Sequence, residues 1–306
     1  MDILYVALGL ILLVAGGDAL VSGAVGVAQR LRLSPLVIGV TLVGFGTSLP
    51  ELLTSLQAAW RGSPGIALGN VVGSNIANVL LIGGVAATMV AIPVARGTLR
   101  RDGVWMLAAS LAALALTRLE TPGPLLGGAL MLGLAAYLLH ALRSGERGPE
   151  LPESAPSVGP NVLRLVLGLG ATIGGAALLV EGASALARDA GLSEALIGLT
   201  LVAVGTSLPE LATSVVAARR GEGALALGNI LGSNIFNILG ILGATALLAP
   251  LPIDPVIAGF DIWVMLAAAV LLVVLARTGR TLARWEGLLL LALYAVYIGW
   301  LARGVL

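Results

Sequence analysis

The chain has 306 residues, of which 58% are hydrophobic and 11% charged, with 42 glycines and a mean hydropathy of +1.04. This composition is typical of a membrane protein and excludes an ordinary soluble domain. A formal net charge of +1 without any basic run argues against a nucleic-acid partner, and the lack of cysteine excludes disulfides, thiolate metal sites and thiol nucleophiles.

Ten apolar runs follow one another along the chain, each close to the roughly 20 residues that a helix needs to cross a bilayer. Short loops that carry arginine, proline or glycine separate them. We expect the first run to be retained as a helix rather than removed as a signal, because it has no basic leader and resembles the later runs. The sequence therefore predicts an all-α multi-pass membrane protein with ten transmembrane helices, at 3–28, 34–59, 65–91, 103–118, 123–142, 161–187, 193–218, 224–250, 257–276 and 284–302.

All seventeen basic residues are arginines, and they are shared unequally between the two sides of this ten-helix arrangement. Thirteen belong to the loops that follow the first, third, fifth, seventh and ninth helices, with their flanks, and four belong to the other side. Basic residues concentrate in cytoplasmic loops. The sequence therefore predicts a protein of the cell or inner membrane with both termini extracellular or periplasmic.

A long duplication relates the two halves of the chain. Residues 41–78 align without a gap on residues 200–237 at an offset of 210 − 51 = 159, and 25 of these 38 positions are identical. The offset spans five helices, an odd number, so the second copy must enter the bilayer from the opposite side. We expect two inverted five-helix repeats, at 1–142 with a central motif at 39–83 and at 161–306 with a motif at 198–242. The charged, proline-rich stretch 143–160 between them is predicted to be a cytoplasmic linker.

Both copies of the motif "GTSLPE" place a proline and a carboxylate inside a predicted membrane helix. Because proline cannot donate a backbone hydrogen bond, Pro50 and Pro209 are expected to interrupt the helices at Glu51 and Glu210 and to free carbonyl oxygens as ligands. An ionised carboxylate in hydrocarbon costs about 2.5 kcal/mol or more. No arginine lies in the apolar runs of the second, third, seventh or eighth helix, so we expect a bound cation to be the partner of these glutamates.

Further polar side chains recur beside the glutamates at helical spacing. Residues four apart lie on one helix face, and the pairs are Thr47 and Glu51, Ser74 and Asn78, Thr206 and Glu210, and Ser233 and Asn237. A single serine or threonine can instead hold two helices together, and that interpretation stays open. The full set offers only oxygen donors, which suits hard cations such as Ca²⁺ and Na⁺ and does not suit Zn²⁺ or Cu⁺.

Two other acidic residues, Asp18 and Glu181, lie inside apolar runs and do not align with each other in the repeat. Each could line an access path or bond to a neighbouring helix, and the sequence does not separate these roles. An enzyme is not expected, because Ser48 and Ser207 have no His or Lys partner on the second, third, seventh or eighth helix.

These motifs resemble the two alpha repeats of the sodium/calcium exchanger family, within the cation/calcium exchanger superfamily. The resemblance rests on "GTSLPE" followed by "GNVVGSNIAN" in the first copy, and on "GTSLPE" followed by "GNILGSNIFN" in the second. It implies a core of the second, third, seventh and eighth helices around a row of cation positions. It also implies that the first and sixth helices slide across this core.

The resemblance further implies roles for single residues. Glu51 and Glu210, with the backbone carbonyls of Thr47 and Thr206, would hold Ca²⁺. The flanking Na⁺ positions would use Gly44, Thr47, Ser74 and Glu51 on one side and Ala203, Thr206, Ser233 and Glu210 on the other, while Asn78 and Asn237 would border the middle position.

The implied function is a secondary antiporter that exchanges Na⁺ for Ca²⁺ by alternating access and normally extrudes Ca²⁺. No cofactor is expected; the partners are the two transported ions and the lipid bilayer, and a single chain would be sufficient for transport, with the oligomeric state open. Some relatives carry Asp where this chain has Asn237, which argues against a K⁺ requirement here.

An H⁺/Ca²⁺ or other divalent-cation antiporter is the alternative, although that branch places a glutamate where this chain has Val71 and Ile230. A cation channel suits an inverted repeat less well.

Overall fold

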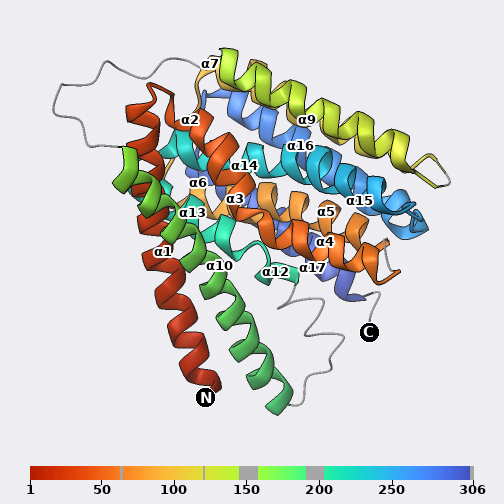
Figure 1. The fold of residues 1–306 in the computed structure, drawn as a ribbon, viewed down its shortest axis with the longest axis horizontal. Helices are drawn as coiled ribbons and strands as arrows, with labels where there is room; N and C mark the ends of the chain where they lie inside the picture. The colour runs from red at the N-terminus through yellow and green to blue at the C-terminus, as the bar shows by residue number, and fades with distance from the viewer. Residues whose placement is uncertain (63–64, 120, 145–157, 191–202, 304–306) are drawn as a thin grey trace.

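The computed structural model describes residues 1–62, 65–119, 121–144, 158–190 and 203–303. In this part of the chain the elements are helices, apart from one two-stranded ribbon (Figure 1). Most of the predicted linker 143–160, residues 198–202 of the second motif and residues 193–202 of the predicted span 193–218 lie outside the described residues.

The first half of the chain contains long helices and several short ones separated by π-helical segments, which are labelled η. Its elements are α1 (Asp2–Arg30), α2 (Pro35–Ile38), η1 (Gly39–Val43), α3 (Gly44–Thr47), α4 (Leu49–Trp60), α5 (Gly65–Ala77), η2 (Asn78–Gly83), α6 (Gly84–Met89), β1 (Ile92–Pro93), α7 (Arg96–Thr98), η3 (Leu99–Gly103), α8 (Val104–Leu116) and α9 (Pro124–Ser144).

The second half repeats much of this order. Its elements are α10 (Val158–Asp189), α12 (Ala203–Gly205), α13 (Leu208–Arg219), α14 (Gly223–Ile235), η5 (Phe236–Leu242), α15 (Gly243–Leu248), η6 (Ile257–Asp261), α16 (Ile262–Thr278), β2 (Thr281–Leu282) and α17 (Arg284–Arg303). The two short strands pair antiparallel, with Ile92 opposite Leu282.

The length and hydropathy of the helices identify a helical membrane protein. Among the described residues, seven helices are long and apolar enough to cross a bilayer, and an eighth span results when the bent pair Pro35–Thr47 and Leu49–Trp60 is counted as one. The predicted spans 103–118 and 193–218 are not among them, because α8 has 13 residues and the second span is described only from residue 203.

Two helices, α1 and α10, pack antiparallel along their length and form an arm beside the other helices (Figure 1). Three glycines on each helix, seven residues apart, lie at the contact: Gly9, Gly16 and Gly23 on α1, and Gly168, Gly175 and Gly182 on α10. A Cβ atom at Gly9 would lie 2.7 Å from the carbonyl oxygen of Gly175. Only glycine therefore permits this approach of the two backbones. The two triplets are themselves separated by 168 − 9 = 159 residues.

A second close contact joins the motif helices. The α14 helix packs against α2, η1 and α3, where a Cβ atom at Gly228 would lie 2.7 Å from the carbonyl oxygen of Leu36. The α14 helix is almost wholly buried. The polar residues of the second motif are therefore held within the protein and away from lipid.

Replacing Gly168 by Ala is expected to destabilise the α1–α10 contact, because the new Cβ would lie 2.7 Å from both the Gly16 carbonyl oxygen and the Leu20 Cα. The expected cost is about 1–3 kcal/mol, measured as a fall in the melting temperature of the detergent-solubilised protein. Gly170→Ala on the same helix is the control, since Gly170 is exposed and no described atom lies within 4 Å of its Cβ position. Equal melting temperatures for the two variants would contradict the tight contact.

Candidate functional site

Both motif helices break at a serine just before the carboxylate. The α3 helix ends at Thr47 and α4 begins at Leu49, with a bend of 43° between the two helical pieces. In the second copy, α12 ends at Gly205 and α13 begins at Leu208. The expected interruption is confirmed, and in each copy a proline occupies the start of the new helix, where its missing N–H has no helical acceptor.

The two glutamates are held crosswise by the breaks of the opposite copy. The Ser207 hydroxyl donates to Glu51 Oε1 at 3.2 Å, and the Ser48 hydroxyl donates to Glu210 Oε1 at 2.8 Å. The Thr206 and Thr47 side chains reach the same two carboxylates, in the same crosswise sense. Glu51 is 1% exposed and Glu210 is 2% exposed. The structure thus brings two carboxylates from distant parts of the chain into one buried region.

The second oxygen of each carboxylate has no partner among the described residues. Neither Glu51 Oε2 nor Glu210 Oε2 accepts a hydrogen bond, and no described cationic side chain forms an ion pair with either glutamate. A buried polar atom left without a partner costs about 1–3 kcal/mol, and more when it is charged. Such an atom requires an explanation, and a bound ion is one of the few that exist.

Two asparagines also have buried side-chain polar atoms without a hydrogen-bond partner. Both side-chain atoms of Asn78 and of Asn237 are buried without a hydrogen-bond partner among the described residues. The segment η5, which contains Asn237, packs against the Glu51 helix α4, and η2, which begins at Asn78, packs against the Glu210 helix α13. The unpartnered amides and carboxylates therefore belong to elements that meet in the same core.

Each of these asparagines lies in a π-helical segment, Asn78 at the first residue of η2 and Asn237 at the second residue of η5. π-helical turns are rare and occur frequently at functional sites, because the wider turn leaves backbone groups without their usual partners. The residue types in these segments give no signal of the change in helix type, so the sequence does not predict them.

Two further asparagines, which were not among the predicted site residues, contact the backbone of the glutamates. Asn70 donates to the Glu51 carbonyl oxygen at 3.1 Å and to Ser55 Oγ at 3.0 Å. Asn229 makes the same two contacts in the second copy, to the carbonyl of Glu210 at 3.3 Å and to the hydroxyl of Ser214 at 2.9 Å. These amides position the backbone of each glutamate. Their identity in both copies of the duplication was the signal that could have identified them.

The other predicted site residues lie on the same elements. Thr47 is buried and donates to the Val43 carbonyl oxygen at 3.0 Å. Ser233 donates to the carbonyl oxygen of Gly44 at 3.1 Å, so these two residues, which were expected at opposite Na⁺ positions, are in contact in this conformation. Ser74 is buried on α5, one turn before Asn78, and Ala203 begins α12.

A cavity of about 420 Å³ reaches the breaks from the side of α10. Pro50, Gly205 and Thr206 line it at the breaks, and Glu181 lines it from α10. Asp18 has a different role, because it forms an ion pair with Arg220 at the end of α13. Asp18 thus bonds to a neighbouring helix, one of the two roles that the sequence left open, and Glu181 lines a cavity that ends at the breaks.

The donor set of the core consists of carboxylate, carboxamide, hydroxyl and carbonyl oxygens. Within the described ranges, no three His, Asp or Glu side chains gather as a possible metal site elsewhere. Two carboxylates that share one buried region carry a formal charge of −2, which one divalent cation or a set of monovalent cations would compensate. Oxygen donors of this kind suit hard cations.

Comparison with known proteins agrees with this chemistry. The family model described as "Sodium/calcium exchanger protein" matches residues 1–143 and 161–303. The sodium/calcium exchanger MaX1 of Methanosarcina acetivorans is 35% identical over 97% of both chains. The inner membrane protein YrbG of Escherichia coli K12 is 37% identical over 96% of this chain and 94% of the relative. A solved structure of the sodium-calcium exchanger NCX_Mj, soaked with Na⁺ and Sr²⁺, aligns with a TM-score of 0.88 at 37% identity over 97% of both chains. The chain therefore belongs to the sodium/calcium exchanger protein family.

Proposed function

We propose that this chain exchanges Na⁺ for Ca²⁺ by alternating access and normally extrudes Ca²⁺ from the cell. The observation that carries the proposal is the pair Glu51 and Glu210, buried together, each with one carboxylate oxygen unpartnered among the described residues. One Ca²⁺ would neutralise both carboxylates. Several Na⁺ ions would compete for the same oxygens, and the exclusion of one load by the other is what couples the two fluxes.

The proposed Ca²⁺ ligands are the carboxylates of Glu51 and Glu210 and the backbone carbonyls of Thr47 and Thr206. We assign the Na⁺ positions to Gly44, Thr47, Ser74 and Glu51, and to Ala203, Thr206, Ser233 and Glu210, with Asn78 and Asn237 beside the middle position. Because the Ser233 hydroxyl bonds to Gly44 in this conformation, that hydroxyl must turn away when its Na⁺ position fills.

The architecture that fits this function is ten transmembrane helices in two inverted repeats, 1–142 and 161–306, joined by the linker 143–160. The antiparallel packing of α1 and α10, whose contact glycines share the 159-residue offset of the motifs, supports this inversion. The close glycine contacts also suit a pair of helices that slide as one body across the core.

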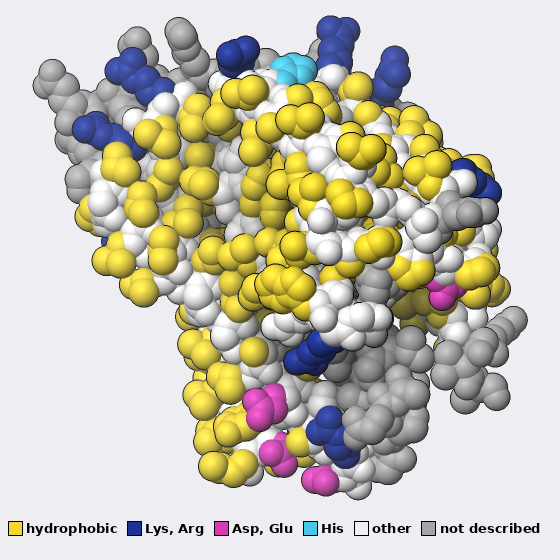
Figure 2. Space-filling model, turned by 45° about the vertical axis from the view of Figure 1, so that its right-hand side comes forward, with side chains coloured by type: hydrophobic (Ala, Val, Ile, Leu, Met, Phe, Trp, Pro, Cys, Tyr) yellow, Lys and Arg dark blue, Asp and Glu magenta, His cyan; other side chains and the backbone are white. Residues whose placement is uncertain are grey.

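The orientation that we propose places both termini outside the cytoplasm, in an inner or plasma membrane. Arginines and the histidine gather along one edge of the molecule, above a broad band of hydrophobic side chains (Figure 2). An arginine-rich edge is typical of the cytoplasmic side. The Escherichia coli relative is named an inner membrane protein.

The direct test is ⁴⁵Ca²⁺ uptake into proteoliposomes preloaded with Na⁺. We expect uptake with an outward Na⁺ gradient and none with K⁺-loaded vesicles or with a pH gradient alone. Uptake driven by the pH gradient would favour the H⁺-coupled alternative.

Glu51→Gln and Glu210→Gln should each abolish uptake, because the amide keeps the shape and loses the charge that offsets dehydration of Ca²⁺. Glu222→Gln, outside the site, is the matched control and should transport normally. Wild-type rates in either site variant would place the ion elsewhere.

The same two substitutions that abolish transport should not lower the stability of the ion-free protein. In choline buffer without Na⁺ or Ca²⁺, Glu51→Gln and Glu210→Gln are expected to melt at or above the wild-type temperature, because each removes a buried charge and keeps an oxygen that accepts the serine hydroxyl. Glu286→Ala is the contrast, since Glu286 Oε2 accepts from the Ala283 amide at 2.7 Å and alanine has no side-chain oxygen to accept it, so this variant should melt below the wild type. Site variants that melt well below the wild type would indicate that the carboxylates stabilise the fold.

Exchange should move net charge if three Na⁺ pass for each Ca²⁺, the ratio that the family resemblance suggests. Uptake of ⁴⁵Ca²⁺ by Na⁺-loaded vesicles is then expected to accelerate when valinomycin and an inward K⁺ gradient make the lumen positive, because that potential favours Na⁺ exit. Rates that are independent of the clamped potential would contradict this ratio.

A further inference from the structure

Three arginines surround one pocket on the arginine-rich edge of the molecule. Arg100 of η3, Arg277 of α16 and Arg280 of the turn before β2 line a cavity of about 810 Å³. All three side chains are exposed, and none makes a hydrogen bond or an ion pair with a described residue. Among the described residues no acidic side chain lines this pocket, which leaves it with a concentrated positive charge.

The backbone holds one of these arginines in an uncommon conformation. Arg280 has φ of +50°, whereas the preceding Gly279, which would accept such an angle freely, has φ of −108°. A non-glycine residue at positive φ is uncommon and is maintained by its surroundings. Here the Arg280 carbonyl accepts from the Val94 amide at 2.8 Å, beside the paired strands β1 and β2. The ribbon thereby fixes Arg280 at the same pocket as Arg100.

The rest of the pocket lining is largely apolar. It is formed by Leu99, Val104 and Leu107 from η3 and α8 and by Val273 from α16. Val104 is 57% exposed, on a helix that is apolar along its length. A small soluble anion would gain no binding free energy from contact with these apolar side chains. An amphipathic anion would place its charge at the arginines and its hydrocarbon on the valines and leucines.

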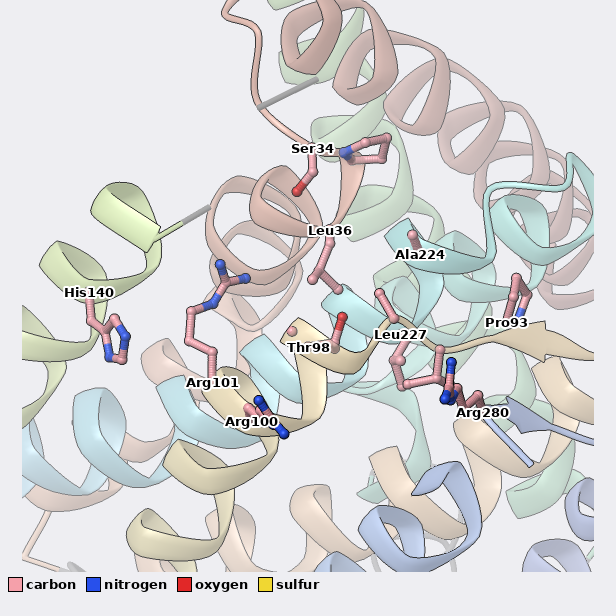
Figure 3. A pocket seen from close by; sticks show the side chains of 14 residues that line it. Ser34, Leu36, Pro93, Thr98, Arg100, Arg101, His140, Ala224, Leu227 and Arg280 are labelled. Atoms are coloured by element: carbon pink, nitrogen blue, oxygen red, sulfur yellow. The ribbon is translucent and has the colours of Figure 1, made fainter. Parts of the chain in front are cut away.

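A second pocket, of about 800 Å³, adjoins the first and shares Val94, Arg100 and Arg280 with it. Figure 3 shows Arg100, Arg101 and Arg280 around Thr98 in this second pocket. Its other walls include Leu36 of α2 and Leu227 of α14, both of which belong to the motif helices. An occupant at Arg100 and Arg280 therefore lies next to the helices that carry the candidate ion site.

We propose that the pocket between η3, α8 and α16 binds an anionic glycerophospholipid. The lipid phosphate lies among Arg100, Arg277 and Arg280, and an acyl chain lies along Val104, Leu107 and Val273. Basic pockets between membrane helices on the cytoplasmic side recognise anionic headgroups, and each arginine near the headgroup contributes about fivefold in affinity. The proposal is independent of which ions the chain transports.

The test is a native mass spectrometry titration of the purified full-length chain with dioleoylphosphatidylglycerol, and with dioleoylphosphatidylcholine as the zwitterionic comparison. Wild type is expected to retain phosphatidylglycerol preferentially. The triple variant Arg100→Gln, Arg277→Gln, Arg280→Gln should lose about 100-fold in affinity. Because these side chains are exposed, the variant should keep its fold, which circular dichroism checks. The matching triple Lys variant should keep most of the binding.

The matched control is Arg30→Gln, Arg164→Gln, Arg219→Gln, which removes the same charge from three exposed arginines outside both pockets. This control should bind phosphatidylglycerol like the wild type. Equal loss in the two Gln triples, equal retention of the two lipids by the wild type, or no loss in the pocket variant would each overturn the proposal. Competition by millimolar inorganic phosphate that equals the competition by added phosphatidylglycerol would also overturn it, because the site would then take free phosphate.

Discussion

The structure depends on two carboxylates that are buried together without a cationic side chain from the described residues to neutralise them. Glu51 and Glu210 each accept a hydroxyl from the opposite copy of the motif, and each keeps one oxygen without a described partner. Burial of two like charges is unfavourable, and a cation between them would offset that cost. The broken helices, the Asn70 and Asn229 amides and the close packing around them hold these two groups in place.

Glycine determines how closely the surrounding helices approach. The contact between α14 and α2 places the second motif beside the first, and the glycine triplets of α1 and α10 bring two long backbones into direct contact. Because glycine contacts contain few side chains that could change their packing, the helices in contact are expected to move together as rigid units. The cavity beside Glu181 lies between α10 and the breaks, where the proposed sliding motion would open or close it.

The sequence predicted the parts of this protein that depend on local chemistry or on repetition. The duplication, the proline breaks and the two glutamates followed from residue types and spacing alone. The π-helical segments at Asn78 and Asn237 did not, because helix type there is set by tertiary packing. The seven-residue glycine period of α1 and α10 was visible in the sequence, but its partner helix is apparent only in three dimensions. The pairing of Asp18 with Arg220 and the arginine pocket likewise depend on which segments meet.

The central claim is that both carboxylates form one ion site, and a calorimetric double-mutant cycle tests it most directly. Ca²⁺ is titrated in Na⁺-free buffer into the wild type, Glu51→Gln, Glu210→Gln and the double variant. The account predicts a single Ca²⁺ per wild-type chain, severe loss of affinity in each single variant, and little further loss in the double variant, because the site needs both charges at once. Two independent Ca²⁺ sites, with each single variant retaining one at wild-type affinity, would contradict it.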